Sequence, residues 1–233
     1  MAPSVLITGG AGAIGRAVAE SFAGDGWEVH LLDLAPDLEA IAGRLGARAL
    51  RADVTDPAAL AGAVAGVPAL DVLVTAVGTW PQLLIDELSF EEWNRQIAIN
   101  LSSVYLSVKC LLPALRAARG CVVNFASAAA LVGHETMIAY CTAKAGVIGL
   151  TRALAVALGP EGIRVNSVLP GALDTPSNEA LPPEILQDAQ RARALRRAGT
   201  AQDLVGATRF LASSGAEFVT GQSIVVDGGL HFL

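Results

Sequence analysis

The stretch SVLITGGAGAIG (residues 4–15) decides the fold, because it passes from a short apolar run into a glycine-rich turn and then into a helical pattern. Glycines let the backbone approach a pyrophosphate closely, and the N-terminus of the following helix offers free N–H groups and a partial positive charge. A tight turn between a strand and a helix needs glycine in any protein, so the loop alone is weak evidence. Its place after the first predicted strand favours a dinucleotide site.

Short apolar runs alternate with helical patterns along the rest of the chain. We expect strands at 4–8, 28–33, 47–54, 71–75, 121–127, 164–169 and 223–227, and helices at 57–66, 89–99, 101–118, 138–158 and 202–212, besides the one that follows the glycine turn. Apolar strands that alternate with helices are typical of a parallel sheet covered on both faces. The sequence therefore predicts one α/β domain (residues 1–233) with a doubly wound, Rossmann-type parallel sheet of about seven strands.

Composition narrows the class of protein. Hydrophobic residues make up 53% of the chain and charged residues 16%, which argues against disorder. The net charge is −6 and the only basic run is RARALRR (191–197), which we interpret as a polar helix face, so nucleic acid is not an expected partner. The three cysteines, Cys110, Cys121 and Cys141, lack paired spacing, which indicates a reducing compartment and no metal site.

Two further features bear on localisation. Strand-like sequence begins at about Ser4, which leaves no room for a signal peptide. The longest apolar stretch, residues 58–77, is broken by Pro68 and Asp71 and reads as a helix, a turn and a strand. We expect a cytoplasmic protein that does not bind a membrane.

An acidic residue, Asp33, ends the second predicted strand, 18 residues after Gly15. A carboxylate at this position can accept hydrogen bonds from the adenosine ribose and would repel a 2′-phosphate. Leu34 and Ala35 offer no guanidinium group, and Gly12 leaves the loop without a basic residue. The sequence therefore predicts NAD(H) rather than NADP(H), although a plain surface carboxylate at a strand end is the alternative.

The only two tyrosines and the only two lysines form two matching pairs, YLSVK (105–109) and YCTAK (140–144). Positions four apart share a helix face, so each phenol can lie near an ammonium group that favours its ionised form. Hydride transfer to or from a carbinol carbon needs such a proton-transfer group. Only Tyr140 follows a hydroxyl at a strand end, Ser127, and ligands bind at that edge of a parallel sheet.

These motifs together resemble the short-chain dehydrogenase/reductase family over nearly the whole chain. The resemblance is carried by TGGAGAIG (8–15, with Ala13 in place of the more usual glycine), DV (53–54), PGALDT (170–175), FVTGQSIVVDGG (218–229) and the set Asn100, Ser127, Tyr140 and Lys144. The family usually has NNAG after the fourth strand, whereas this chain has TAVG (75–78), which puts the local stability there in doubt.

The resemblance implies a role for each residue of the set. Tyr140 would be the general acid/base, Lys144 would hold the nicotinamide ribose and lower the pKa of Tyr140, and Ser127 would orient the substrate oxygen. Asn100 would disturb its helix and hold a water in a proton relay to Lys144. Residues implied to contact the cofactor are Gly9, Gly12, Ala13, Ile14, Gly15, Asp33, Leu34, Asp53, Val54, Ala76, Gly78, Tyr140, Lys144, Pro170, Gly171, Leu173 and Thr175.

The substrate side is less defined by the sequence. Pocket candidates are Trp80, Ala128, Leu131, His134, Met137 and Leu181, which suit an apolar or aromatic ketone or secondary alcohol. His134 could instead be an ordinary loop histidine, and the segment at about 176–197 could form a lid.

The helix at about 143–158 is apolar on almost every side, so it is either fully buried or half of an interface in a homodimer or homotetramer. Three functions remain open at this stage. An NAD(H)-dependent oxidoreductase that interconverts a secondary alcohol and a ketone is favoured over a 3-oxoacyl-type ketoreductase that uses NADPH. The third is a non-catalytic dinucleotide-sensing protein, since a fold does not determine function.

Overall fold

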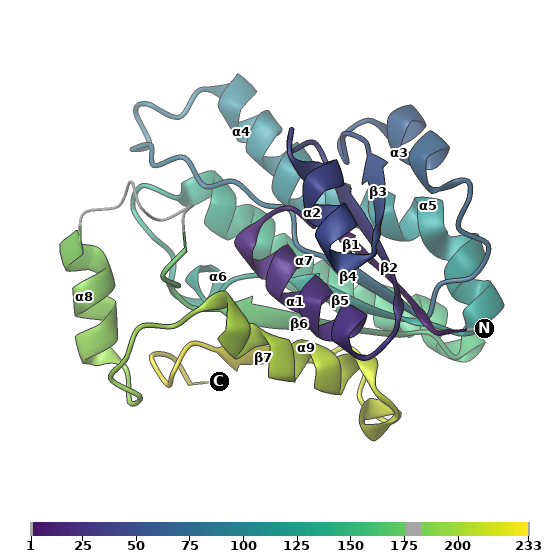
Figure 1. The fold of residues 1–233 in the computed structure, drawn as a ribbon. Coiled ribbons are helices and arrows are strands. Elements are labelled where there is room, and N and C mark those ends of the chain that lie inside the picture. The colour runs from purple at the N-terminus through teal and green to yellow at the C-terminus, as the bar shows by residue number, and fades with distance from the viewer. Residues whose placement is uncertain (1, 176–182, 233) are drawn as a thin grey trace.

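Strand β1 (Ser4–Thr8) lies in the interior of the sheet and is buried along its whole length between β2 (Glu28–Asp33) and β4 (Val72–Thr75). The computed structural model describes residues 2–175 and 183–232 (Figure 1). The remaining strands are β3 (Arg48–Arg51), β5 (Cys121–Phe125), β6 (Arg164–Pro170) and β7 (Ser223–Val226). All neighbours pair in parallel in the order β3-β2-β1-β4-β5-β6-β7, which confirms the predicted doubly wound sheet.

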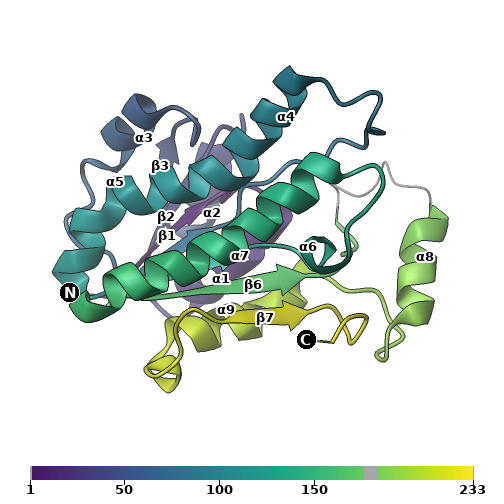
Figure 2. The same cartoon turned by 180° about the vertical axis from the view of Figure 1, so that it is seen from behind.

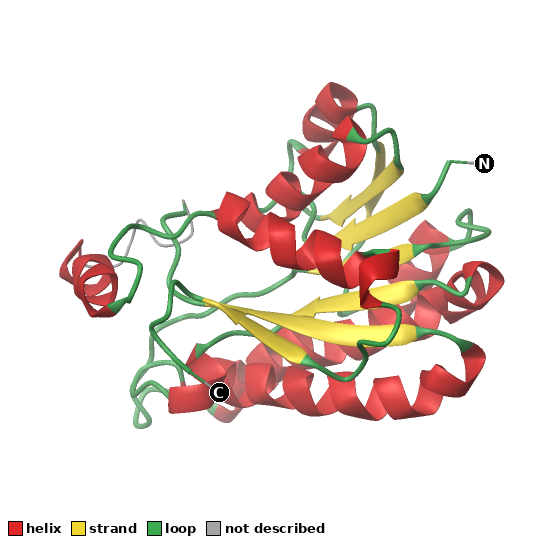
Figure 3. Ribbon diagram, turned by 90° about the horizontal axis from the view of Figure 1, so that it is seen from below, coloured by secondary structure: helices red, strands yellow, loops and turns green. Residues whose placement is uncertain are grey.

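Helices cover both faces of this sheet because successive residues of each strand point to opposite sides. Val5 and Ile7 of β1 pack in one core with α1 (Ala13–Gly24), α2 (Leu38–Leu45) and α9 (Val205–Ala212). Leu6 packs in a second core, to which α3 (Pro57–Val64), α5 (Ser103–Ala118) and α7 (Ile138–Leu158) contribute. Figures 1 and 2 show the two layers from opposite sides, and Figure 3 shows the sheet between them.

The predicted boundaries differ from the observed ones at a few elements. Strand β3 is four residues long rather than the eight expected at 47–54, and helix α2 was not expected. The two helices expected at 89–99 and 101–118 are α4 (Phe90–Ile97) and α5, joined without a break through a π-helical turn (Ala98–Ser102). Two short helices lie at the carboxyl edge, α6 (Ala129–Val132) and α8 (Pro183–Ala192), and α8 stands away from the body in Figure 1.

Two helical stretches, Phe90–Ala118 and Ile138–Glu161, are long and apolar enough to cross a membrane by length and composition alone. Both pack an inward face on the sheet, where α7 buries Val147, Ile148 and Leu158, and core helices can be equally apolar. The outward face of α7 stays exposed, and Val156 is 80% accessible. The alternative in which this helix is buried within its own chain is therefore wrong.

Candidate active site

The glycine turn between β1 and α1 forms a cradle of bare backbone at the carboxyl edge of the sheet. Gly9 has a φ of +72°, a region that favours glycine. A β-carbon at Gly15 would lie 2.2 Å from the carbonyl oxygen of Gly9, so the helix can start this close to the turn only without a side chain. Gly12 caps α1 without any side-chain hydrogen bond. This turn fits a pyrophosphate on the helix N-terminus.

The Asp33 carboxylate ends β2 and accepts three backbone hydrogen bonds, from Ala11 (3.0 Å), Leu34 (2.7 Å) and Ala35 (3.0 Å). The bond from Ala11 ties the glycine turn to the end of β2, and the other two hold the carboxylate in one orientation. Asp33 is thus fixed beside the turn, where the resemblance places the adenosine ribose.

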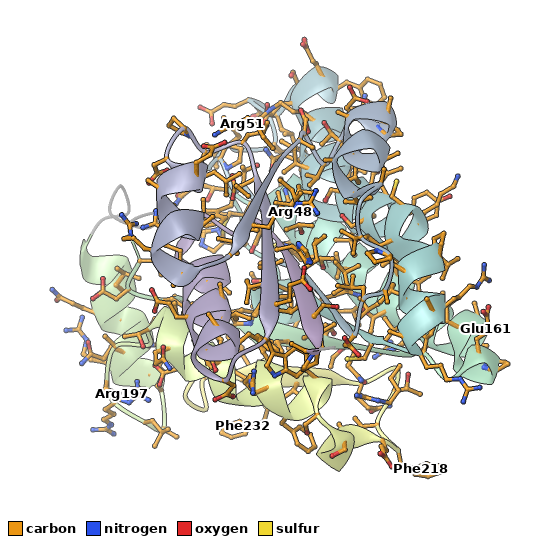
Figure 4. The ribbon with its side chains drawn as sticks, turned by 45° about the vertical axis from the view of Figure 1, so that its right-hand side comes forward. Arg48, Arg51, Glu161, Arg197, Phe218 and Phe232 are labelled. Carbon is orange, nitrogen blue, oxygen red and sulfur yellow. The ribbon has the colours of Figure 1, made fainter. Side chains whose placement is uncertain are left out.

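Two guanidinium groups bond to backbone carbonyls of the glycine turn and of the residues that follow Asp33. Arg16 Nε donates to the Ala11 carbonyl at 2.7 Å. Arg51 (Figure 4) donates to the carbonyls of both residues that follow Asp33, at 3.0 and 2.9 Å, and pairs with Glu39 at 2.6 Å. Sequence reasoning did not find Arg51 because it is far from Asp33 in sequence, yet it is the register partner of Asp33 on the neighbouring strand β3.

Tyr140, in the first turn of α7, lies beside Ser127, which follows β5. Burial raises the pKa of Tyr140 to about 12, and a hydrogen bond with the Ser127 side chain acts in the opposite direction. The expectation that Lys144 would bring this pKa toward neutrality does not hold in the protein alone. Lys144 Nζ lies 5.8 Å from the centroid of the phenol ring, and the cost of burying a phenolate sets the direction of the pKa shift.

Lys144 is almost fully buried, with 3% of its surface exposed. Its ammonium group donates to the carbonyl of Phe125 at 2.9 Å and approaches that of Val77 at 3.5 Å. Burial lowers the pKa of Lys144 to about 8. The group is therefore held at the carboxyl ends of β4 and β5, on the same side of α7 as Tyr140.

Asn100 sits in the π-helical turn, as expected of a residue that disturbs its helix. Its side chain is fully buried and bonds both backbone groups of Thr79, accepting from the N–H (3.1 Å) and donating to the carbonyl (2.9 Å). A β-carbon at Gly78 would lie 3.1 Å from Asn100 Oδ1 and 3.5 Å from Lys144 Nζ. The absence of a side chain at Gly78 therefore lets Asn100 and Lys144 both pack closely against the segment that follows β4.

A cavity of about 410 Å³ brings most of the predicted residues together. From the predicted sets it is lined by Gly12, Ala13, Ile14, Gly15, Ala76, Gly78, Ser127, Tyr140, Lys144, Pro170, Gly171, Leu173, Thr175, Trp80, Ala128, His134 and Met137. Trp80 lies against Tyr140, with ring centroids 5.9 Å apart. The glycine turn and the Tyr–Lys pair thus share one cavity.

Other predicted residues lie elsewhere. Gly9, Asp33, Leu34, Asp53, Val54 and Asn100 are not part of the cavity lining, and neither is Leu131. Leu131 is displaced because the short helix α6 turns its neighbour Val132 to the cavity instead. Asp53 accepts hydrogen bonds from the N–H and hydroxyl of Thr55, both at 2.7 Å. Leu181 and the first part of the proposed lid, 176–182, lie outside the described residues.

Residues 9–231 match a family model described as enoyl-(acyl carrier protein) reductase. The chain belongs to the short-chain dehydrogenase/reductase family. It is 35% identical to the probable galactose dehydrogenase GalD of Rhizobium meliloti (strain 1021), over 97% of this chain and 94% of that protein. It is also 35% identical to the 3-oxoacyl-(acyl-carrier-protein) reductase FabG of Escherichia coli (strain K12), over 98% of this chain and 97% of that protein.

A solved structure of a short-chain dehydrogenase/reductase relative shows the same fold. It is a 3-oxoacyl-(acyl-carrier protein) reductase with bound NAD from Brucella melitensis, with a TM-score of 0.90 and 32% identity. The match covers 99% of this chain and 92% of that chain.

The departure from the family's NNAG segment has a structural counterpart. Thr75 Oγ1 donates to Asn124 Oδ1 of β5 at 2.8 Å, and Asn124 Nδ2 donates to Thr151 Oγ1 of α7 at 2.9 Å. All three residues are buried, at 2%, 0% and 0% exposure. The threonine at 75 therefore takes part in a buried hydrogen-bond chain between β4, β5 and α7.

Some residues of the cavity wall were missed by sequence reasoning. They are Gln82, Ala172, Leu230 and His231. His231 lies beyond the family-like segment that ends at residue 229, so no motif pointed to it. The glycine pair at 228–229 was the available signal, because two glycines after a strand predict a turn back toward the sheet edge.

Proposed function

We propose that this chain is an NAD(H)-dependent oxidoreductase that interconverts a secondary alcohol and a ketone, with Asn100, Ser127, Tyr140 and Lys144 as its catalytic group. The observation that carries the proposal is the shared cavity. Tyr140, Ser127 and Lys144 line it together with the glycine turn. A nicotinamide dinucleotide with its pyrophosphate on that turn would supply the hydride acceptor or donor for the carbon atom of the substrate.

Tyr140 moves the proton of the substrate oxygen. Because burial raises its pKa to about 12, the phenol carries its proton at neutral pH and is ready to donate it to a ketone oxygen. Ser127 orients the same oxygen through its hydroxyl, and Lys144 presents a buried donor for the ribose hydroxyls. Asn100 positions the loop at Thr79 and, through it, Trp80 above the phenol ring.

NAD(H) is the proposed cofactor, with NADP(H) disfavoured by the charge of Asp33. Three backbone donors hold that carboxylate beside the turn, and Arg51 is already engaged by Glu39 and two carbonyl groups. A 2′-phosphate at this position would be repelled by the fixed carboxylate of Asp33, and Arg51 is not free to neutralise it.

The proposed substrate has an apolar or aromatic body, because Trp80, Val132, Met137 and Leu230 line the cavity. A 3-oxoacyl-type ketoreductase remains the second candidate, and the 35% identity to FabG of Escherichia coli favours it. The similarly related GalD is named for a sugar, so these relatives do not choose a substrate class.

We further propose a single-domain, cytoplasmic protein that forms a homodimer or homotetramer through α7 and binds neither nucleic acid nor membrane. The outward face of α7 is exposed at Ala145, Gly149, Ala153 and Val156. These small and apolar residues suit close packing against a second copy of the chain.

The test is an absorbance screen that compares NAD(H) with NADP(H). Oxidation of secondary alcohols is followed by the appearance of the reduced cofactor, and reduction of ketones and of a 3-oxoacyl thioester is followed by its loss. We expect turnover of apolar secondary alcohols with NAD. Preferred reduction of the thioester with NADPH would support the second candidate. Cofactor binding without turnover of any substrate would favour a dinucleotide sensor.

A further inference from the structure

The C-terminal turn places a histidine in the cavity wall and holds it with a buried carboxylate. Asp227 directly follows β7 and is 5% exposed, whereas His231 lines the cavity that contains Tyr140. Asp227 Oδ1 accepts from the N–H groups of Gly229 (2.9 Å) and Leu230 (3.0 Å). Asp227 Oδ2 accepts from the backbone N–H of His231 (2.9 Å) and contacts its ring Nδ1 (2.8 Å).

Packing from the other side makes this turn rigid. The carbonyls of Gly228 and Gly229 accept hydrogen bonds from Leu195 (2.8 Å) and Ala194 (3.2 Å), in the segment after α8. A β-carbon at Gly171 would lie 2.6 Å from the β-carbon of Asp227, so the 170–171 segment packs directly on the turn. The imidazole is therefore held in position relative to Pro170 and Gly171, which are among the predicted cofactor contacts.

The contact with Asp227 also determines which ring nitrogen is available to a ligand. Burial acts to raise the pKa of Asp227, but hydrogen bonds from His231, Leu230 and Gly229 outweigh it and hold that pKa below its usual value. An ionised carboxylate only accepts hydrogen bonds, so a proton sits on Nδ1, and Nε2 is the ring nitrogen that remains for a hydrogen bond with a ligand. Nε2 makes no hydrogen bond within residues 2–175 and 183–232.

We propose that His231 is a specificity-determining residue that accepts a hydrogen bond from a second hydroxyl group of the substrate. This inference rests on the proposed function and narrows its substrate class to secondary alcohols with an apolar body and a further hydroxyl. An acceptor in a largely apolar wall discriminates strongly, because a substrate without a matching donor leaves it unpaired. Asp227 acts as a positioning residue, since it touches the imidazole and not the substrate.

The test compares substrates that differ only in the second donor. Cyclohexanol, the 1,2-, 1,3- and 1,4-cyclohexanediols and the monomethyl ether of the best diol are oxidised with the cofactor that the screen selects. We expect kcat/KM for that diol to exceed the value for its ether. In His231→Leu the ratio of diol to ether should fall by roughly three- to tenfold, the range for one hydrogen bond. His231→Gln, which keeps an acceptor near the position of Nε2, should restore part of the ratio.

His134 offers a matched control, because it is a second histidine in the cavity wall, with its Nδ1 3.1 Å from the Thr136 hydroxyl. His134→Leu should leave the diol-to-ether ratio within about twofold of the wild-type value. An unchanged ratio in His231→Leu, or a ratio lost in His134→Leu instead, would overturn the inference. The inference would also be overturned if the wild type preferred a hydroxycyclohexane carboxylate and His231→Leu removed that preference. The imidazole of His231 would then bind the substrate as a cation and not as a hydrogen-bond acceptor. If the wider screen finds turnover of secondary alcohols but none of the diols in this series is oxidised, this inference fails and the proposed function stands. If no secondary alcohol or ketone is turned over at all, the proposed function itself fails.

Discussion

Lys144 Nζ lies 5.8 Å from the centroid of the Tyr140 ring. The second Tyr–Lys pair has nearly the same internal geometry, with Lys109 Nζ 5.6 Å from the centroid of Tyr105. The difference between the pairs is therefore their place in the fold. Tyr140 and Lys144 line the cavity at the carboxyl edge of the sheet, whereas Tyr105 is 45% exposed on α5.

This contrast gives a matched pair of variants. Tyr140→Phe removes the hydroxyl that would transfer the proton, so we expect kcat to fall by roughly 10²- to 10⁴-fold with binding of NADH retained. Tyr105→Phe removes the same group from the surface pair and should leave kcat within about twofold. Initial rates and calorimetric titration of NADH measure both effects. Activity of Tyr140→Phe within about tenfold of the wild type would disprove the assignment of Tyr140.

The raised pKa of Tyr140 predicts different pH dependences for the two directions of the reaction. Reduction of a ketone needs the protonated phenol, which a pKa of about 12 preserves through neutral and mildly alkaline pH. Oxidation of an alcohol needs the phenolate, whose fraction increases as pH rises toward that pKa. We therefore expect kcat/KM for oxidation to rise with pH while reduction stays level from about pH 6 to about pH 8. Rates measured in both directions over this range check the sign, and an oxidation rate that falls with pH would contradict it.

Asp33 provides a test of the cofactor preference that can keep two of its three backbone hydrogen bonds. Asp33→Asn keeps an oxygen that can accept the backbone bonds from Leu34 and Ala35 but removes the charge. We expect the ratio of kcat/KM for NAD to that for NADP to fall by roughly tenfold or more. The reason is that repulsion between a carboxylate and a nearby phosphate costs about 1 kcal/mol or more.

Arg51 supplies the control for this prediction, because it lies beside the same position and is engaged by Glu39. In the double variant Asp33→Asn/Arg51→Met the gain in NADP use should be smaller than in Asp33→Asn. An unchanged cofactor ratio in Asp33→Asn would show that this carboxylate does not contact the ribose.

The sequence predicted the parallel sheet and many of the residues that line the cavity, because both depend on local patterns. Apolar runs fix the strands, and the ends of parallel strands meet at one edge, so Ser127 and Tyr140 could be placed there from spacing. Contacts between neighbouring strands were not visible in this way. Arg51 reaches the residues after Asp33 only through the register of β3 with β2. The direction of the pKa shift of Tyr140 was also missed, because that shift depends on how deeply the phenol is buried, and sequence spacing does not reveal burial.

Thr75 shows how a departure from the family pattern can be tested as a packing question. Its hydroxyl is the donor to Asn124 Oδ1, and the chain continues to Thr151 within a fully buried region. Thr75→Val preserves the shape of the side chain but leaves the Asn124 oxygen without this donor, so we expect the free energy of unfolding to fall by about 1–3 kcal/mol.

Thr75→Ser is the matched control for this change. It retains the hydroxyl and loses one methyl group, so its cost should stay near that of a single buried methyl, about 1 kcal/mol. Urea denaturation of the three proteins with equal m-values gives the comparison. Because Thr75 does not line the cavity, KM for the best substrate should be unchanged in both variants. If Thr75→Val is as stable as the wild type, the hydrogen-bond chain does not stabilise the β4–β5 junction. Thr75 would then not compensate for the absence of the asparagines that the family usually has there.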